Sequence, residues 1–251
     1  MESNELISRM DSELESFIED NKYLNEPLTK TRAQMFVKQH RLNSIYRNSV
    51  LKLRVATNVP MWDIKTGIME AVSEEIIGDE KFFGGKPHWK ALEELGEYIG
   101  LTVKEIRDEK PLMSTVSAWI MYDSLMSNSH WLLGLVGNTC VERAWIPGYG
   151  KKLLGGKGIA GFERDRWKSL FKLPDDQIVF FSMHSEADVK HSEMGWKNTA
   201  KYAVEYRLED EVLKKLKLNL QAWKYYYNGI VEAADLVDRG KEPSYFTDNV
   251  P

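Results

Sequence analysis

The 251-residue sequence is poor in cysteine and in long apolar runs. Cys140 is its single cysteine, which excludes an intramolecular disulfide framework and is typical of a reducing compartment. The opening segment MESNELISRMDSELESFIEDN is acidic and polar, without the basic and apolar regions of a secretion signal. No apolar run approaches the roughly 20 residues needed to cross a bilayer. We therefore expect a cytoplasmic protein that does not enter the membrane.

The sequence also lacks a concentration of charge of one sign. The formal net charge at pH 7 is −4, and the 34 lysines and arginines are scattered along the chain. Binding a polyanion requires a positive field, so we expect no nucleic-acid partner. Hydrophobic residues make up 43% and charged residues 29% of the chain, a balance typical of a globular protein with a core. At this length we predict one domain over residues 1–251.

What the sequence does contain is helical periodicity. Apolar residues recur three and four positions apart, and β-branched alternating runs are few, which predicts an all-α protein. We expect six to eight helices in a single bundle. Two of them are apolar nearly all round and should lie in its middle, near residues 114–126 and 130–146. The others are expected near residues 4–19, 29–59, 61–77, 87–100, 174–204 and 209–237, with a further short helix over 161–171.

Three polar side chains share one face of the helix expected over 174–204. At about 100° per residue, Asp188 lies near 40° and His191 near −20° relative to His184, so all three point the same way. Imidazole nitrogen and carboxylate oxygen are ligands that hold iron or manganese, and facing helices of a bundle can supply more of them. The alternative interpretation is a solvated polar face, since serine, glutamate and lysine side chains surround the three.

Further ligands can come from other helices. Glu142 lies in the otherwise apolar segment HWLLGLVGNTCVERAWI, where an acid requires a cation, either a metal ion or a basic residue such as Arg143. Glu74 and Glu75 end the helix over 61–77, and His88 opens the next helix. Adjacent residues on a helix point about 100° apart, so we expect one of the two glutamates to face inward.

The other histidines and the cysteine have simpler interpretations. His40 has polar neighbours on both sides and is expected on the surface. His130 stands at a helix start and is expected to be structural. Cys140 is expected to be a buried, unreactive thiol.

With these residues in view, the chain resembles the haem-oxygenase-like di-iron oxidases, relatives in fold of pyrroloquinoline quinone synthase and of the thiaminase-type helical proteins. The resemblance covers about residues 58–227 and rests on the segments SEEIIGDEKFFGGKPHWKALEELGEYIG, TCVERAWIP and HSEADVKH. It implies a haem-oxygenase-like helical bundle with a di-iron centre. Carried over residue by residue, the implied metal ligands are Glu75, His88, Glu142, His184, Asp188 and His191.

The resemblance also implies a function. Two Fe(II) ions would bind O2 as co-substrate and oxidise a small organic substrate, and Mn is a conceivable substitute metal. We expect a small amine or amino acid as substrate, with N-oxygenation, desaturation or C–C cleavage as the outcome. An external reductant and a homodimer are both compatible with this expectation. Some members of the family use an additional glutamate on the preceding long helix, but the matching stretch YRNSVLK has no acid near Ser49. The site would then have six protein ligands, or one iron would bind weakly.

Other functions remain open at this point. Ferritin-like di-iron proteins need paired Glu-x-x-His motifs, and the chain has none. A fatty-acid decarboxylase of the resembling family would need a deep tunnel, for which Trp119, Met126 and Leu133 are available, although such residues are typical of a simple core.

Two further alternatives belong to the same fold. In aminobenzoate-forming relatives a lysine is the nitrogen donor, and Lys157 resembles that position, but Val141 stands where those relatives have a tyrosine. A metal-free binding or salvage protein of the thiaminase type would use Cys140 as a nucleophile or have no catalytic activity.

Overall fold

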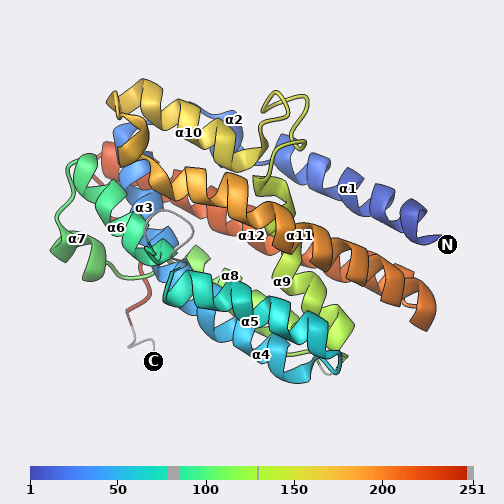
Figure 1. Ribbon diagram of the computed structural model, residues 1–251. Coiled ribbons are helices and arrows are strands. Elements are labelled where there is room, and N and C mark those ends of the chain that lie inside the picture. The colour runs from blue at the N-terminus through green and yellow to red at the C-terminus, as the bar shows by residue number, and fades with distance from the viewer. Residues whose placement is uncertain (79–84, 129, 248–251) are drawn as a thin grey trace.

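The structure is a computed structural model that describes residues 1–78, 85–128 and 130–247, except for the side chains of residues 140, 186–188, 190 and 191. Every regular element in these ranges is helical (Figure 1), which confirms the all-α prediction. The first half contains α1 (Ser3–Glu19), α2 (Lys22–Asn25), α3 (Lys30–Ile45), the π-helical segment η1 (Tyr46–Leu51), α4 (Lys52–Asn58), α5 (Trp62–Ile76), α6 (His88–Tyr98) and α7 (Val103–Arg107). The second half contains α8 (Met113–Met126), α9 (Trp131–Trp145), α10 (Gly158–Phe171), the 3-10 turn η2 (Asp175–Gln177), α11 (Val179–Tyr206) and α12 (Glu209–Asp238).

The number of helices exceeds the six to eight expected. The helix predicted over residues 29–59 is divided, because η1 interrupts its α-helical hydrogen bonding between α3 and α4. Two further helices, α2 and α7, are too short to produce a periodic apolar pattern. They are instead held by their caps: Asn21 accepts from the backbone N–H of Tyr23, and Thr102 forms a capping box with Glu105.

Helix α9 lies at the centre of the bundle, in contact with α1, α4, α8, α10, α11 and α12. Its apolar surface on all sides predicted this position, and the prediction is confirmed. Helix α8 shares the central position only in part, because Ile120 is 66% exposed on its outer side. The long helices α11 and α12 run alongside α9 (Figure 1), so α9 and α11 can present side chains to the same interior space.

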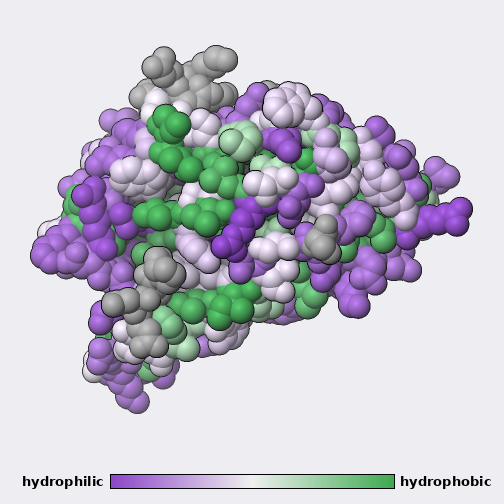
Figure 2. All heavy atoms as spheres, turned by 90° about the horizontal axis from the view of Figure 1, so that it is seen from below, coloured by the Kyte–Doolittle hydropathy of each residue, from purple (hydrophilic) through white to green (hydrophobic). Residues whose placement is uncertain are grey.

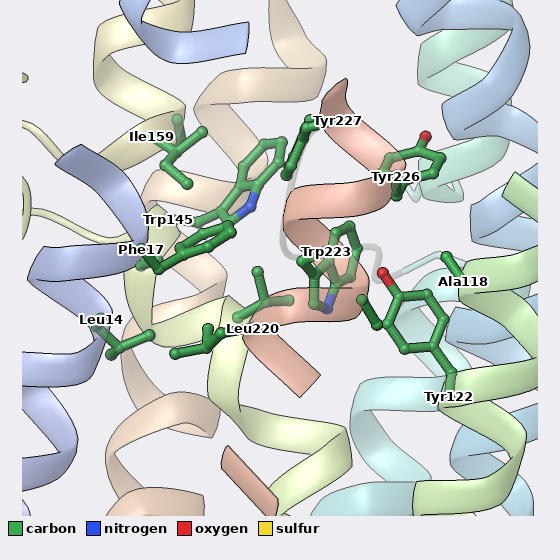
Figure 3. Close-up of a cluster of buried hydrophobic side chains, with 14 of the residues drawn as sticks. Leu14, Phe17, Ala118, Tyr122, Trp145, Ile159, Leu220, Trp223, Tyr226 and Tyr227 are labelled. Atoms are coloured by element: carbon green, nitrogen blue, oxygen red, sulfur yellow. The ribbon is translucent and has the colours of Figure 1, made fainter. Parts of the chain in front are cut away.

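Aromatic side chains fill much of the core. Figure 3 shows Trp223, Tyr226 and Tyr227 of α12 pointing into it, with Tyr122 of α8 on one side and Trp145 of α9 on the other. Their ring centroids lie at separations typical of packed aromatic pairs, as in the 5.6 Å between Trp223 and Tyr226. This packing forms an apolar wall beside the polar cluster described below.

Trp119, Met126 and Leu133, the residues considered for a tunnel, are buried members of the same core. In the described ranges no helix combines the length and the apolarity required of a membrane span. The face seen from below Figure 1 carries apolar side chains interrupted by polar ones (Figure 2).

Candidate metal centre

The candidate centre begins at the π-helical segment η1. Residues five apart diverge by about 140° on an α-helix but return to one side where the helix widens to π geometry. Arg47 and Lys52 have this spacing, and with Asn48 they are all buried, with exposures of 1%, 2% and 6%. Buried polar groups need polar partners, so the side chains of Arg47, Asn48 and Lys52 require hydrogen-bond partners inside the bundle. Such π-helical turns occur frequently at functional sites.

Three of the predicted ligands meet in this interior. Glu75 near the end of α5, His88 at the start of α6 and His184 in α11 each offer a ligand atom, and these atoms lie within 4.8 Å of one another. All three residues are buried. Glu75 Oε2 lies 3.0 Å from His88 Nδ1, and the rings of His88 and His184 lie 4.6 Å apart between centroids. Of the two adjacent glutamates, Glu75 is thus the better candidate ligand. Glu74 is only partly buried and does not belong to this group of ligand atoms.

Glu142 lies close to the group but is held by a lysine. Its Oε1 is 2.6 Å from the Lys52 ammonium nitrogen, which also lies 3.4 Å from Glu75 Oε1. The sequence left a metal ion or a basic residue such as Arg143 open as the cation for Glu142. Here the contacting base is Lys52, whereas Arg143 donates to the hydroxyl of Tyr149. A metal-binding role for Glu142 stays a prediction.

Asp188 and His191 complete the predicted ligand set. Both lie within α11, four and seven residues after His184, but their side chains fall outside the described part of the structure. Their role as ligands therefore also stays a prediction.

The two carboxylates and the lysine determine one another's charge. Burial would raise the pKa of Glu75, but nearby His88 and Lys52 outweigh burial and hold this pKa well below its usual range. Burial acts in the same way on Glu142, where Lys52 and then Arg47 outweigh it and lower the pKa. For Lys52, burial would lower the pKa, but Glu142 and Glu75 raise it. The cluster thus contains two carboxylates and one ammonium at neutral pH.

The imidazole of His184 is neutral and held in one orientation, as a metal ligand requires. Burial, followed by repulsion from His88, lowers its pKa to about 4. Its Nδ1 lies 2.9 Å from the carbonyl oxygen of Phe180, an acceptor only, so Nδ1–H donates to it and the proton-free Nε2 remains available. A backbone carbonyl that orients a histidine ring in this way is typical of metal-ligating histidines.

A cavity of about 20 Å³ lies among these groups, enough for about one water molecule. Its lining combines acids, bases and large aromatic side chains: His40, Arg47, Asn48, Glu75, Val141, Glu142, Trp145, His184 and Trp223. The indoles of Trp145 and Trp223 form the bulk of its apolar side.

The expectation that His40 lies on the surface is wrong. His40 is 3% exposed, stacks on Phe36 at 4.7 Å between centroids, and has its Nδ1 3.2 Å from the hydroxyl of Tyr226. Its polar neighbours suggested exposure, but Gln39 is also buried and accepts from Thr115 and from the backbone N–H of Leu112. Polar residues of α3 are thus buried where they form hydrogen bonds inside the protein. The spacing of apolar residues along the sequence cannot reveal such burial.

Burial of His40 predicts loss of stability in acid. Burial, followed by repulsion from His184, lowers its pKa to about 3. Between the ordinary value of about 6.5 and this pKa, the unfolded chain binds a proton that the folded chain does not, so the free energy of unfolding falls as the pH decreases. We expect His40→Gln to flatten this dependence in metal-free protein, by about 1.4 kcal/mol per unit of pKa difference. Urea denaturation of both proteins from pH 8 to pH 3 measures this dependence. The difference in free energy of unfolding between wild type and His40→Gln at pH 8 gives the packing cost of the substitution. If the two free energies of unfolding fall in parallel below pH 6.5, the prediction is contradicted.

The remaining expectations concern residues outside the cavity. His130 is the N-terminal cap residue of α9 and stacks on Trp131, as expected of a structural histidine. Lys157 precedes α10, is half-exposed and pairs with Asp165 at 2.6 Å, so it does not reach the cavity. The side chain of Cys140 lies outside the described part of the structure.

Comparison with known proteins bears on both fold and chemistry. The family model described as "Iron-containing redox enzyme" matches residues 34–224, a range that includes all six predicted ligands. No curated protein matches the chain.

Among solved structures, a domain of unknown function with a heme oxygenase-like fold from Shewanella denitrificans is similar, with 15% identity and a TM-score of 0.67 over 98% of this chain and 99% of that chain. A CADD-like protein of unknown function from Nostoc punctiforme also has 15% identity, with a TM-score of 0.68 over 92% of this chain and 98% of that one. A second structure of the Nostoc protein gives a TM-score of 0.65 at the same identity, over 94% and 97% of the two chains. This likeness confirms the predicted haem-oxygenase-like fold.

Proposed function

The chain belongs to the family of iron-containing redox enzymes, and from this premise we propose that it is a non-haem iron oxygenase whose centre includes Glu75, His88 and His184. In its full form the proposal has two Fe(II) ions, with Glu142, Asp188 and His191 as the remaining ligands. Mn(II) is the proposed substitute metal. The observation that supports it best is the convergence of one carboxylate and two imidazoles, from three different helices, within 4.8 Å in a buried space.

The donor set fits iron. Imidazole nitrogen and carboxylate oxygen, with space left for other ligands, are typical of non-haem iron oxygenases. Glu75 Oε2 and His88 Nδ1 lie 3.0 Å apart, yet neither has a hydrogen-bond partner of acceptable geometry. Buried polar atoms without partners are costly, and a shared cation would satisfy both.

The chain's own residues hold this donor set in place. Asn48 donates to Glu75 Oε1 at 3.0 Å, which fixes the carboxylate plane and leaves Oε2 directed at His88. The carbonyl of Phe180 fixes the ring of His184. Bound iron would supply the redox chemistry needed to activate O2, and the indoles of Trp145 and Trp223 give the cavity an apolar side.

We further propose that the substrate is a small amine or amino acid. Two carboxylates, those of Glu75 and Glu142, line the cavity. The contact between Glu142 and the Lys52 ammonium supports the idea that this lining accepts a primary ammonium group. By contrast, the residues available for a fatty-acid tunnel pack in the core and do not line the cavity, and Lys157 lies away from it. An external reductant is part of the proposal if the reaction needs more electrons than the substrate provides.

The proposal is tested with anaerobically purified, metal-free protein. About two equivalents of Fe(II) are added, bound iron is measured after desalting, and the protein is then exposed to O2 with a panel of small amines and amino acids, with and without ascorbate. We expect iron retention, a transient visible absorption band and O2 consumption that depends on one class of amine. A fatty-acid panel serves as the contrast. Protein that retains no iron would contradict the proposal.

A further inference from the structure

Lys52 places a fixed positive charge inside the proposed metal centre. Its side chain is 3% exposed, and its ammonium nitrogen lies 2.6 Å from Glu142 Oε1 and 3.4 Å from Glu75 Oε1. Glu75 is buried and the Glu142 side chain is only 13% exposed, so solvent screens these charges poorly. The ammonium therefore occupies the space between Glu142 and Glu75 that a bridging cation would need.

The position of Lys52 is built into the backbone. Lys52 is the first residue of α4, directly after η1, and Arg47 and Asn48 of η1 are anchored by contacts of their own. Arg47 donates to the carbonyl oxygens of Gly137 and Asn138 in α9, and Asn48 donates to Glu75. These contacts fix the segment against α9 and α5, so Lys52 is held at the cluster.

The charges of the cluster are already balanced on this side. Glu142 and Glu75 carry two negative charges, and Lys52 together with nearby Arg47 carries two positive charges. A divalent ion at Glu75, His88 and His184 can use Glu75 Oε2, the oxygen facing His88 and away from the Lys52 contact at Oε1. A second divalent ion at Glu142 would meet the ammonium of Lys52 at close range, and like charges at such distances repel strongly in a buried site.

We infer that Lys52 competes with the second metal ion for Glu142, so that the protein holds one tightly bound ion and accepts a second only when the ammonium is displaced. This inference rests on the proposed metal centre. It assigns to Lys52 a positioning and selecting role, which determines metal stoichiometry and does not require contact with substrate.

The test is a metal count in solution. Metal-free full-length protein is titrated anaerobically with Fe(II), and in parallel with Mn(II), and the bound ions are counted by equilibrium dialysis with elemental analysis. Wild type is expected to bind one ion tightly and a second weakly. In Lys52→Met, which keeps the length of the side chain and removes its charge, the second ion should tighten by about 10- to 100-fold, the range in which residues around metal ligands alter affinity. Lys52→Arg, which keeps the charge, should retain the wild-type count.

Thermal unfolding provides a second readout of the same variants. Without metal, Lys52→Met leaves the two carboxylates of Glu142 and Glu75 with only the positive charge of Arg47 nearby, so its Tm should fall. Saturating metal should then raise the Tm of Lys52→Met more than that of wild type, because two ions replace the lost charge. The matched control is Lys38→Met in α3, which removes the Lys38–Glu109 ion pair of 2.8 Å away from the cluster. Its metal count and its metal-induced shift in Tm should equal those of wild type.

The outcomes separate this inference from the proposed function. Two tightly bound ions in wild type, or an unchanged count in Lys52→Met, would overturn the role of Lys52 and leave the iron enzyme standing. No bound metal in wild type or in any variant would overturn the proposed function itself. If Lys52→Met does not fold, Glu142→Gln is the deciding variant. In Glu142→Gln the first metal ion should keep its wild-type affinity. Loss of that first ion would show that it uses Glu142 as a ligand, which contradicts the assignment of Glu142 to Lys52.

Discussion

Replacing His184 by alanine is expected to remove the tightly bound iron and, with it, iron-dependent O2 consumption. His184 supplies one of the two described imidazoles of the centre, and its ring is already neutral and oriented by the carbonyl of Phe180. Loss of a direct ligand should cost more than the roughly 10- to 100-fold seen when residues around the ligands are changed. We therefore expect iron affinity to fall by more than 100-fold, measured by dialysis against Fe(II) under anaerobic conditions.

A matched histidine substitution controls for this effect. His130→Ala removes a partly buried histidine at the start of α9 that belongs to no metal-ligand group among the described side chains. Its iron content and O2 consumption should stay at the wild-type level. Circular dichroism must show native helix content for both variants. Unchanged iron binding in a folded His184→Ala protein would contradict the assignment of the centre.

His184 also illustrates what the sequence could predict. A histidine on a largely apolar helix, with a second histidine and an aspartate on the same face, requires a polar partner, which predicted a metal ion, and the structure brings His184 together with Glu75 and His88. The apolar surface of α9 likewise predicted its central position, and the acid Glu142 within it predicted a nearby cation. These predictions depend on local spacing and on the cost of burying charge, both of which are visible in a single sequence.

The identity of that cation was not visible. Lys52 contacts Glu142 because η1 widens the helix before it, and the stretch YRNSVLK has no residue that marks a π-helical segment. Read as an α-helix, Arg47 and Lys52 point in different directions, so neither could be assigned to the site. The burial of His40 was missed for a related reason: its partner Tyr226 is 186 residues away in the chain. Contacts that depend on backbone irregularity or on long-range packing require the structure.

Arg47 also carries the second large effect, on stability. Its guanidinium donates to the carbonyl oxygens of Gly137 and Asn138 and to Asn48, and it lies over the ring of Trp223 at 4.9 Å from the centroid. Arg47→Met would keep much of the apolar stem but remove the charged donor from Asn48 Oδ1 and from the two α9 carbonyls, of which that of Gly137 keeps Asn219 as a donor. A hydrogen bond to a charged group contributes about 1.5–3 kcal/mol, and several are lost together, so we expect the free energy of unfolding to fall by about 3–5 kcal/mol.

Urea denaturation of metal-free protein measures this loss, and the next helix, α4, offers a control. Arg54 lies in α4, pairs with Asp123 on the surface, and has a side chain that is 47% exposed. Exposed ion pairs contribute about 0–1 kcal/mol, so Arg54→Met should change stability little. A loss in Arg47→Met no larger than that in Arg54→Met would show that water or a neighbouring donor satisfies the carbonyls of α9. The anchoring of η1, and with it the fixed position of Lys52, would then need another cause.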